Sequence, residues 1–124
     1  MNLAIWIVTI FLAAAFLLAG TMKIITPKQQ LYDRGMKYVE DFSANTTKTI
    51  GGLEVLAGLG LILPALFDIA TILVPLAAAG LVATMVGAAF VHIRRGEITG
   101  IAAPLILGAL ALFVAITRFG SYAL

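Results

Sequence analysis

The sequence predicts an all-α integral membrane protein, a four-helix bundle built from antiparallel hairpins with an amphipathic interfacial helix between the first two spans. Hydrophobic residues make up 62% of the 124 residues and charged residues only 11%, whereas ordinary soluble domains carry roughly 25% charged residues. Four apolar stretches, at residues 3–22, 50–67, 69–91 and 98–117, are long enough to cross a bilayer core of about 30 Å as helices. The whole chain, 1–124, is therefore expected to form a single transmembrane domain.

The first element, residues 3–22, and the fourth, residues 98–117, stand apart, but the second and third spans are separated only by a short turn at residues 64–68. A connection this short forces two spanning helices to run antiparallel, so residues 50–67 and 69–91 are expected to form a hairpin. Asp68 is the expected N-cap of the third span because aspartate is a favoured capping residue.

Small residues mark positions at which helix backbones can approach one another closely in lipid. They are Ala15 and Ala19 in the first span, Gly58 and Gly60 in the second, Ala79, Ala83 and Gly87 in the third, and Gly108, Ala111 and Ala115 in the fourth. We interpret these positions as helix-packing contacts that carry no chemistry.

The long connection between the first two spans shows helical order although it is too polar to cross a membrane. Thr26 followed by Pro27 is a typical helix start. One face of the following segment gathers Leu31, Gly35, Tyr38, Val39 and Phe42. This pattern predicts one amphipathic helix over residues 27–42, lying on the membrane surface or packed as a cap on the mouth of the bundle, followed by a loop over residues 43–49.

The basic residues lie almost entirely on one side of the predicted bundle. That side holds Lys23, Lys28, Arg34, Lys37, Lys48, Arg94 and Arg95, whereas the other side holds Arg118. Because cytoplasmic loops are enriched in lysine and arginine, both termini are expected to lie outside. The expected location is the inner (cytoplasmic) membrane of a bacterium.

Four polar side chains are expected to gather near the cytoplasmic ends of the spans. Glu54 lies inside the second span, roughly 6 Å from its start, and Lys23 ends the first span with a stem long enough to reach the same depth. His92 ends the third span on the stripe that also carries Thr84. Carboxylates at membrane depth usually face a protein interior, a cavity or a basic partner, which makes these residues the candidate ligand-binding set.

The sequence excludes several kinds of chemistry. The chain has no cysteine, so it can form no disulfide, thiolate metal site or dithiol relay, and any redox role would need a bound cofactor or a partner's cysteines. The single histidine supplies too few ligands for a zinc or haem site, and no metal is expected. No nucleophile stands beside a base, so no catalytic residue is assigned, and no basic patch interleaved with aromatics indicates nucleic acid as a partner.

Four motifs resemble the DoxX-like membrane protein family. They are LLAGTMK closing the first span, IGGLEVLAGLGLILP in the second, VGAAFVHIRRGE ending the third and LFVAITRFG ending the fourth, and the likeness extends over residues 15–119. The resemblance implies a four-helix membrane bundle whose characteristic polar positions are Lys23, Glu54, His92, Arg94 and Arg95. It also implies links to quinone-coupled oxidation of sulfur compounds, to redox-stress complexes and, more distantly, to chaperone or cargo roles.

Each polar position has a structural and a functional interpretation. Lys23 and Glu54 form either an ion pair that locks a hairpin or the wall of a recess for a quinone or another amphipathic ligand. His92 is either an interfacial residue bonded to a loop carbonyl or to Glu97, or a hydrogen-bonding group for a quinone oxygen. Arg94 and Arg95 are either topology determinants or contacts for anionic lipid or a protein partner.

Two hypotheses of function follow from these interpretations. In the first, the protein is the membrane subunit of an oxidoreductase system and binds a quinone-like or lipidic molecule near Glu54 and His92. In the second, it is a non-enzymatic assembly factor or accessory subunit that docks a membrane-protein partner or a second copy of itself. An open apolar cavity that reaches Glu54 would favour the first hypothesis, and a bundle packed solid around a Lys23–Glu54 pair would favour the second.

Overall fold

The computed structural model describes residues 1–124, apart from the side chain of Asp41. Every regular element in this part of the chain is a helix, and four stretches are long and apolar enough to cross a membrane. They are α1 (Asn2–Ile25), α3 (Ala44–Phe67), α4 (Leu73–Arg94) and a last stretch made of the 3-10 helix η2 (Ile98–Ile101) and α5 (Ala102–Phe119). The predicted all-α membrane bundle is confirmed.

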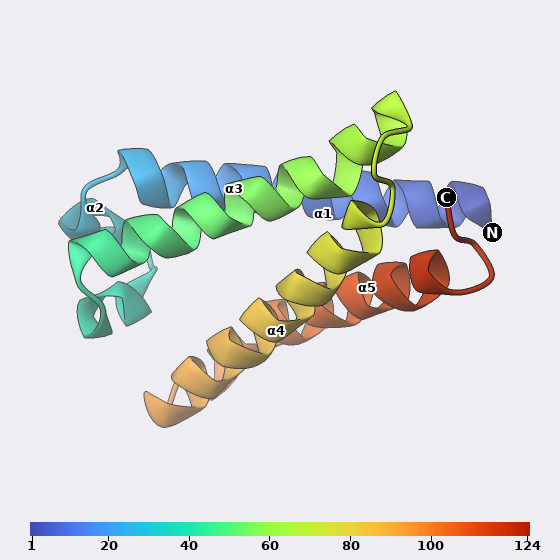
Figure 1. Ribbon diagram of the computed structural model, residues 1–124. Coiled ribbons are helices and arrows are strands. Elements are labelled where there is room, and N and C mark those ends of the chain that lie inside the picture. Colours follow the sequence, from blue (N-terminus) through green and yellow to red (C-terminus); the bar gives the residue numbers. More distant parts are fainter.

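The long helices form two antiparallel pairs that converge at one end of the molecule and diverge toward the other (Figure 1). α1 packs along α3, and α4 packs along α5, whereas the sequential neighbours α3 and α4 touch less extensively. Both chain termini lie at the converging end, here named the termini end. The opposite end, named the loop end, carries residues 26–43 and the turn between α4 and α5.

The apolar core fills the half of the bundle nearer the termini end. Its buried side chains come from all four long helices and include Leu12, Phe16, Leu61, Leu81, Met85 and Val114. Many large apolar side chains instead cover the outer surface of these helices. Exposed apolar surface of this extent is foreign to a water-soluble monomer and is matched by lipid. The chain is therefore an integral membrane protein.

Two glycines allow α1 and α3 to approach closely near the loop end. A Cβ atom at Gly20 would lie 2.5 Å from the carbonyl oxygen of Gly51, and a Cβ atom at Gly51 would lie 2.6 Å from the carbonyl oxygen of Gly20. Neither position can accept a side chain unless the helices separate. Deeper along α3, Gly58 packs against the side chain of Leu17, as expected for one of the predicted packing positions.

Two predicted helix boundaries are wrong. α3 begins at Ala44 rather than at residue 50, because Ser43 caps it by accepting a hydrogen bond from the Thr46 amide at 3.0 Å. The predicted loop at residues 43–49 is therefore the first turn and a half of this helix. Asp68 does not cap α4. It ends α3 in a left-handed conformation with φ 52°, and α4 begins only at Leu73.

The predicted continuous helix over residues 27–42 is also wrong. The segment forms the short helix α2 (Lys28–Asp33) and the 3-10 helix η1 (Lys37–Asp41). Between them Gly35 adopts a φ of 105°, which favours glycine and cannot continue a right-handed helix. Leu31 and Val39 from the predicted apolar face are nevertheless fully buried, whereas Tyr38 and Phe42 are half-buried and Gly35 is exposed.

Candidate functional site

Lys23 and Glu54 form the predicted ion pair at the loop end of α1 and α3. The Lys23 Nζ atom lies 2.5 Å from Glu54 Oε1, and the two side chains are only 8% and 3% exposed. The close contact of α1 and α3 at Gly51, one turn before Glu54, brings the two helices near enough for this pairing. Each charge compensates the other where an isolated charge would be very costly.

His92 lies at the end of α4 and contacts the turn that follows. Its Nδ1 atom is 3.2 Å from Oε1 of Glu97, one of the two predicted structural partners. Gly100 packs directly on the imidazole ring, since a Cβ atom there would lie 2.8 Å from Nδ1. The ring is therefore held from two sides.

Tyr38 of η1 lies between His92 and the ion pair, a role that the sequence did not reveal. Its ring meets the His92 ring edge-on with 5.6 Å between centroids, and Lys23 Nζ lies 5.8 Å from the Tyr38 ring centroid. The sequence pattern places Tyr38 on the apolar face of the predicted helix and gives no reason to assign it to the site. Its hydroxyl group is the one polar feature on that face, but it does not show which residues Tyr38 contacts.

The two arginines after His92 have different surroundings. Arg95 Nη2 lies 2.5 Å from Glu40 Oε1 of η1, and Arg95 Nε lies 3.0 Å from Glu97 Oε1. Arg95 thus connects η1 to the α4–η2 turn within the protein. Arg94 is exposed and lies over the ring of Phe90 at 5.8 Å, so of the two it is the one positioned to meet lipid or a partner.

A cleft with a volume of about 590 Å³ opens between the two helix pairs in the half of the bundle nearer the loop end. The four predicted ligand-binding residues, Lys23, Glu54, Thr84 and His92, all line it. Other contributors include Ala15, Ala19, Met36, Tyr38, Phe42, Gly87, Ala88, Gly100, Ala103 and Leu107. Apolar surface dominates the cleft wall, and the size falls within the range of about 300–1,000 Å³ typical of small-molecule sites.

The predicted packing positions Ala15, Ala19 and Gly87 line this cleft instead of sealing a helix contact. Short side chains at these positions leave space that larger residues would fill. The described residues include no group of three or more histidine, aspartate or glutamate side chains that could hold a metal ion. What the arrangement offers is an apolar volume with hydrogen-bonding groups at its loop end.

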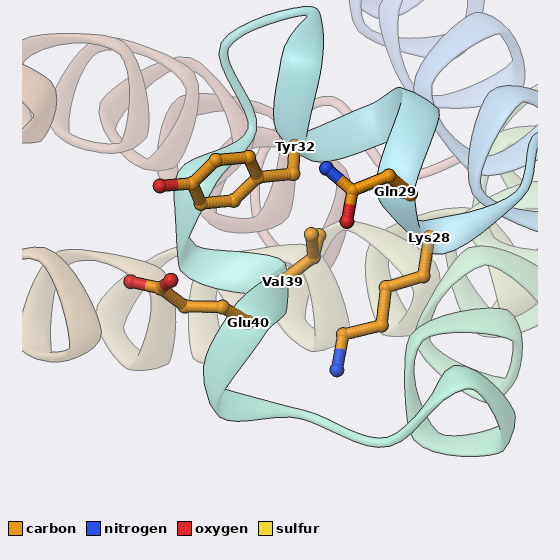
Figure 2. Close-up of a pocket in the computed structure, with 5 residues that line it drawn as sticks. All are labelled: Lys28, Gln29, Tyr32, Val39 and Glu40. Carbon is orange, nitrogen blue, oxygen red and sulfur yellow. The ribbon is translucent and has the colours of Figure 1, made fainter.

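A second hollow lies on the surface, where α2 and η1 meet. Lys28, Gln29, Tyr32, Val39 and Glu40 line it (Figure 2). In Figure 2 the Tyr32 hydroxyl and the Glu40 carboxylate extend to one side of the hollow and the Lys28 side chain extends to another. Because these polar groups do not converge on one point, we assign no ligand to this hollow.

No curated protein and no solved structure matches the chain. The sequence model of the DoxX-like family matches residues 7–114, nearly the whole chain, and this range contains all four cleft residues predicted from the sequence. The chain belongs to the DoxX-like family.

Proposed function

We propose that this membrane protein binds a quinone-like or lipidic small molecule in the cleft between its two helix pairs, as a subunit of an oxidoreductase system. The observation that carries the proposal is the cleft itself. It is an apolar volume of about 590 Å³, and the Lys23–Glu54 pair and His92 stand on its wall. An open cavity that reaches Glu54 is the feature that separates this hypothesis from a bundle packed solid around the same pair.

The chemistry of the wall favours an amphiphile with an uncharged head group. An apolar body would pack against the alanines, methionines and leucine of the cleft. The hydrophobic effect favours its transfer from water, whereas transfer from lipid is favoured only by van der Waals packing. At the loop end the ammonium of Lys23 is already paired with the carboxylate of Glu54. A charged head group would therefore compete with an existing partner, whereas a neutral oxygen could hydrogen-bond without breaking the pair.

The proposal assigns electron transfer to other components. Because the chain has no cysteine, a redox-active pair of thiols would have to come from a partner, and the present chain would hold and position the small molecule. Exposed Arg94, together with lipid-facing small residues such as Gly80, offers surfaces for that partner. The alternative function, an accessory subunit with no ligand, would use the same surfaces and leave the cleft to lipid chains.

The test is native mass spectrometry of the full-length protein, followed by titration of decylubiquinone in nanodiscs. We expect a retained small molecule or saturable decylubiquinone binding in the wild type, and its loss in Ala88→Leu, which fills the cleft. Ala83→Leu is the matched control, because Ala83 lies on the same helix but is exposed and outside the cleft. Absence of both signals in a folded wild type, with a protein partner retained instead, would favour the accessory subunit.

We further propose that both termini face the periplasm of a bacterial inner membrane, on the basis of the basic residues at the loop end. Single cysteines at position 2 and position 46 can be tested in intact cells with an impermeant thiol reagent, since the native chain has none. Labelling should occur at position 2 only. Labelling at position 46 alone would show that the orientation is the opposite of the proposed one.

A further inference from the structure

One nitrogen of His92 is committed to a partner that can only accept a hydrogen bond. The Nδ1 atom lies 3.2 Å from Glu97 Oε1, and an ionised carboxylate has no hydrogen to donate. The hydrogen in this contact must therefore reside on Nδ1. In the neutral imidazole only one nitrogen carries a hydrogen, so Nε2 is left with a free lone pair.

The surroundings hold the ring and its carboxylate partner in this arrangement. Arg95 Nε donates to the same Glu97 oxygen at 3.0 Å, and this charge-assisted hydrogen bond holds the carboxylate in place. On the other side Gly100 packs against the ring, so that a Cβ atom there would lie 2.8 Å from Nδ1 and 3.1 Å from Cε1. His92 lines the cleft, and Nε2 is the ring nitrogen that remains available to a ligand.

Thr84, the other polar residue of α4 that lines the cleft, also donates its hydrogen within the protein. The Thr84 hydroxyl donates to the carbonyl oxygen of Gly80 at 2.9 Å, which leaves its oxygen able to accept. Across the cleft, Lys23 donates to Glu54. Two groups on cleft-lining residues of α4 can therefore accept a hydrogen bond, the Thr84 hydroxyl oxygen and His92 Nε2.

We infer that Glu97 is a positioning residue that fixes His92 as a hydrogen-bond acceptor, so that the cleft selects an amphiphile whose head group carries a hydroxyl. A phenol, a quinol or a long-chain alcohol fits this wall, and the corresponding carbonyl compound fits it less well. A carbonyl oxygen placed against His92 would bring two acceptors together. This inference rests on the proposed function, because it specifies the ligand class of the same cleft.

The tautomer can be measured without any ligand. The chain has a single histidine, so ¹⁵N-histidine labelling gives the signals of one imidazole only. At pH 8.5 we expect the signature of a ring with hydrogen on Nδ1. Glu97→Gln should release this constraint, because an amide can present either its oxygen or its NH₂ group, and should move the signals toward the Nε2–H form. A wild-type ring with hydrogen on Nε2, or a doubly protonated ring, would overturn the inference.

The selectivity is measured with two redox-inert probes of matched length, 4-nonylphenol and 4-nonylacetophenone, titrated into the full-length protein in nanodiscs at pH 8.5. Wild type should bind the phenol about two- to tenfold more tightly than the ketone, the value of one hydrogen bond. In Glu97→Gln this ratio should fall toward one. Arg94→Gln, an exposed neighbour outside the cleft, should retain the wild-type ratio.

The outcomes separate the inference from the proposed function. Equal binding of both probes by wild type, or a ratio that Glu97→Gln leaves unchanged, contradicts the role of Glu97 while the cleft remains a binding site. Failure of both probes to bind a folded wild type with the expected Nδ1–H ring contradicts the proposed function and leaves the tautomer assignment intact. If Glu97→Gln does not fold, the wild-type ¹⁵N spectrum alone still decides the tautomer.

Discussion

The two ends of this bundle are built from the same four helices, yet one end is packed solid and the other is open. At the termini end, large side chains such as Phe16, Leu61 and Leu81 meet in the core. Toward the loop end, small residues such as Ala19 and Ala88 face a cleft. Side-chain size along each helix therefore decides where the two helix pairs join and where they part.

Each end also buries charge, and each does so differently. At the loop end two opposite charges, Lys23 and Glu54, compensate each other. At the termini end the single charge of Arg118 is 4% exposed, and its guanidinium donates to neutral oxygens of Asn2 at 2.8 Å and Tyr122 at 2.9 Å. The ring of Trp6 lies below it at 5.7 Å. Removal of Lys23 or Glu54 should therefore leave an unpaired buried charge at the loop end. Removal of Arg118 should leave only neutral acceptors without a donor at the termini end.

The largest effect is expected from breaking the ion pair. Glu54→Gln and Lys23→Met should each lower the free energy of unfolding in detergent, by about 3–5 kcal/mol if the remaining charge stays buried and ionised. The double variant should lose less than the sum of the two single variants, because it strands no charge. Thermal unfolding of the four proteins measures this coupling. Strict additivity would show that the two side chains do not interact.

The next effect concerns the termini end. Arg118→Met removes one charged donor, Nη1, which serves two neutral acceptors. Asn2 and Tyr122 are exposed, so water can satisfy their oxygens in the variant, and the cost should be about 1.5–3 kcal/mol, less than either change in the ion pair. Arg118→Lys, with one compact ammonium in place of the planar guanidinium, should restore part of the loss. A loss for Arg118→Met equal to that of Lys23→Met would remove the distinction between the two ends.

A smaller effect is expected from the close contact that joins α1 to α3 at the loop end, beside the open cleft. Gly51→Ala should destabilise by about 1–3 kcal/mol, the usual cost of overpacking, because its Cβ would meet the backbone of α1. Gly52→Ala is the matched control, since its Cβ would have nothing within 4 Å. It should stabilise by about 0.4–1 kcal/mol by restricting the unfolded chain. Equal unfolding temperatures for the two variants would contradict the close helix contact.

Much of the fold and part of the site could be predicted because they depend on local patterns and on topology. Apolar length gives the spans, and antiparallel spans place Lys23, Glu54 and His92 at one end. The role of Tyr38 could not be predicted, because it depends on the break at Gly35, where a φ of 105° turns η1 toward α4. A glycine on an apolar stripe can lie within a helix or end one, and tertiary contacts decide which occurs.

The position of the cleft could not be predicted from the sequence pattern either. Small residues permit close packing of helices, but they equally permit an empty volume, and only the partner helix distinguishes the two. Gly20 and Gly51 face each other and join α1 to α3. Ala15 and Ala19 lie on the same α1 helix but line the cleft between the two pairs, because α1 lies farther from α4 at this level.

The smallest effect is expected at η1, whose Tyr38 separates His92 from the ion pair. Glu40 connects η1 to α4 through Arg95, but its side chain is 50% exposed, so the pair is screened and should contribute only about 0.2–1 kcal/mol. Glu40→Gln should therefore leave the unfolding temperature nearly unchanged while it accelerates hydrogen exchange at the Val39 and Phe42 amides, which hydrogen-bond within this segment. Asp33→Asn, in neighbouring α2 and paired with Gln29, is the control and should leave those amides unaffected. If Glu40→Gln instead lowered the free energy of unfolding as much as Glu54→Gln, η1 would unfold together with the four long helices. The loop end would then not be less stable than the termini end.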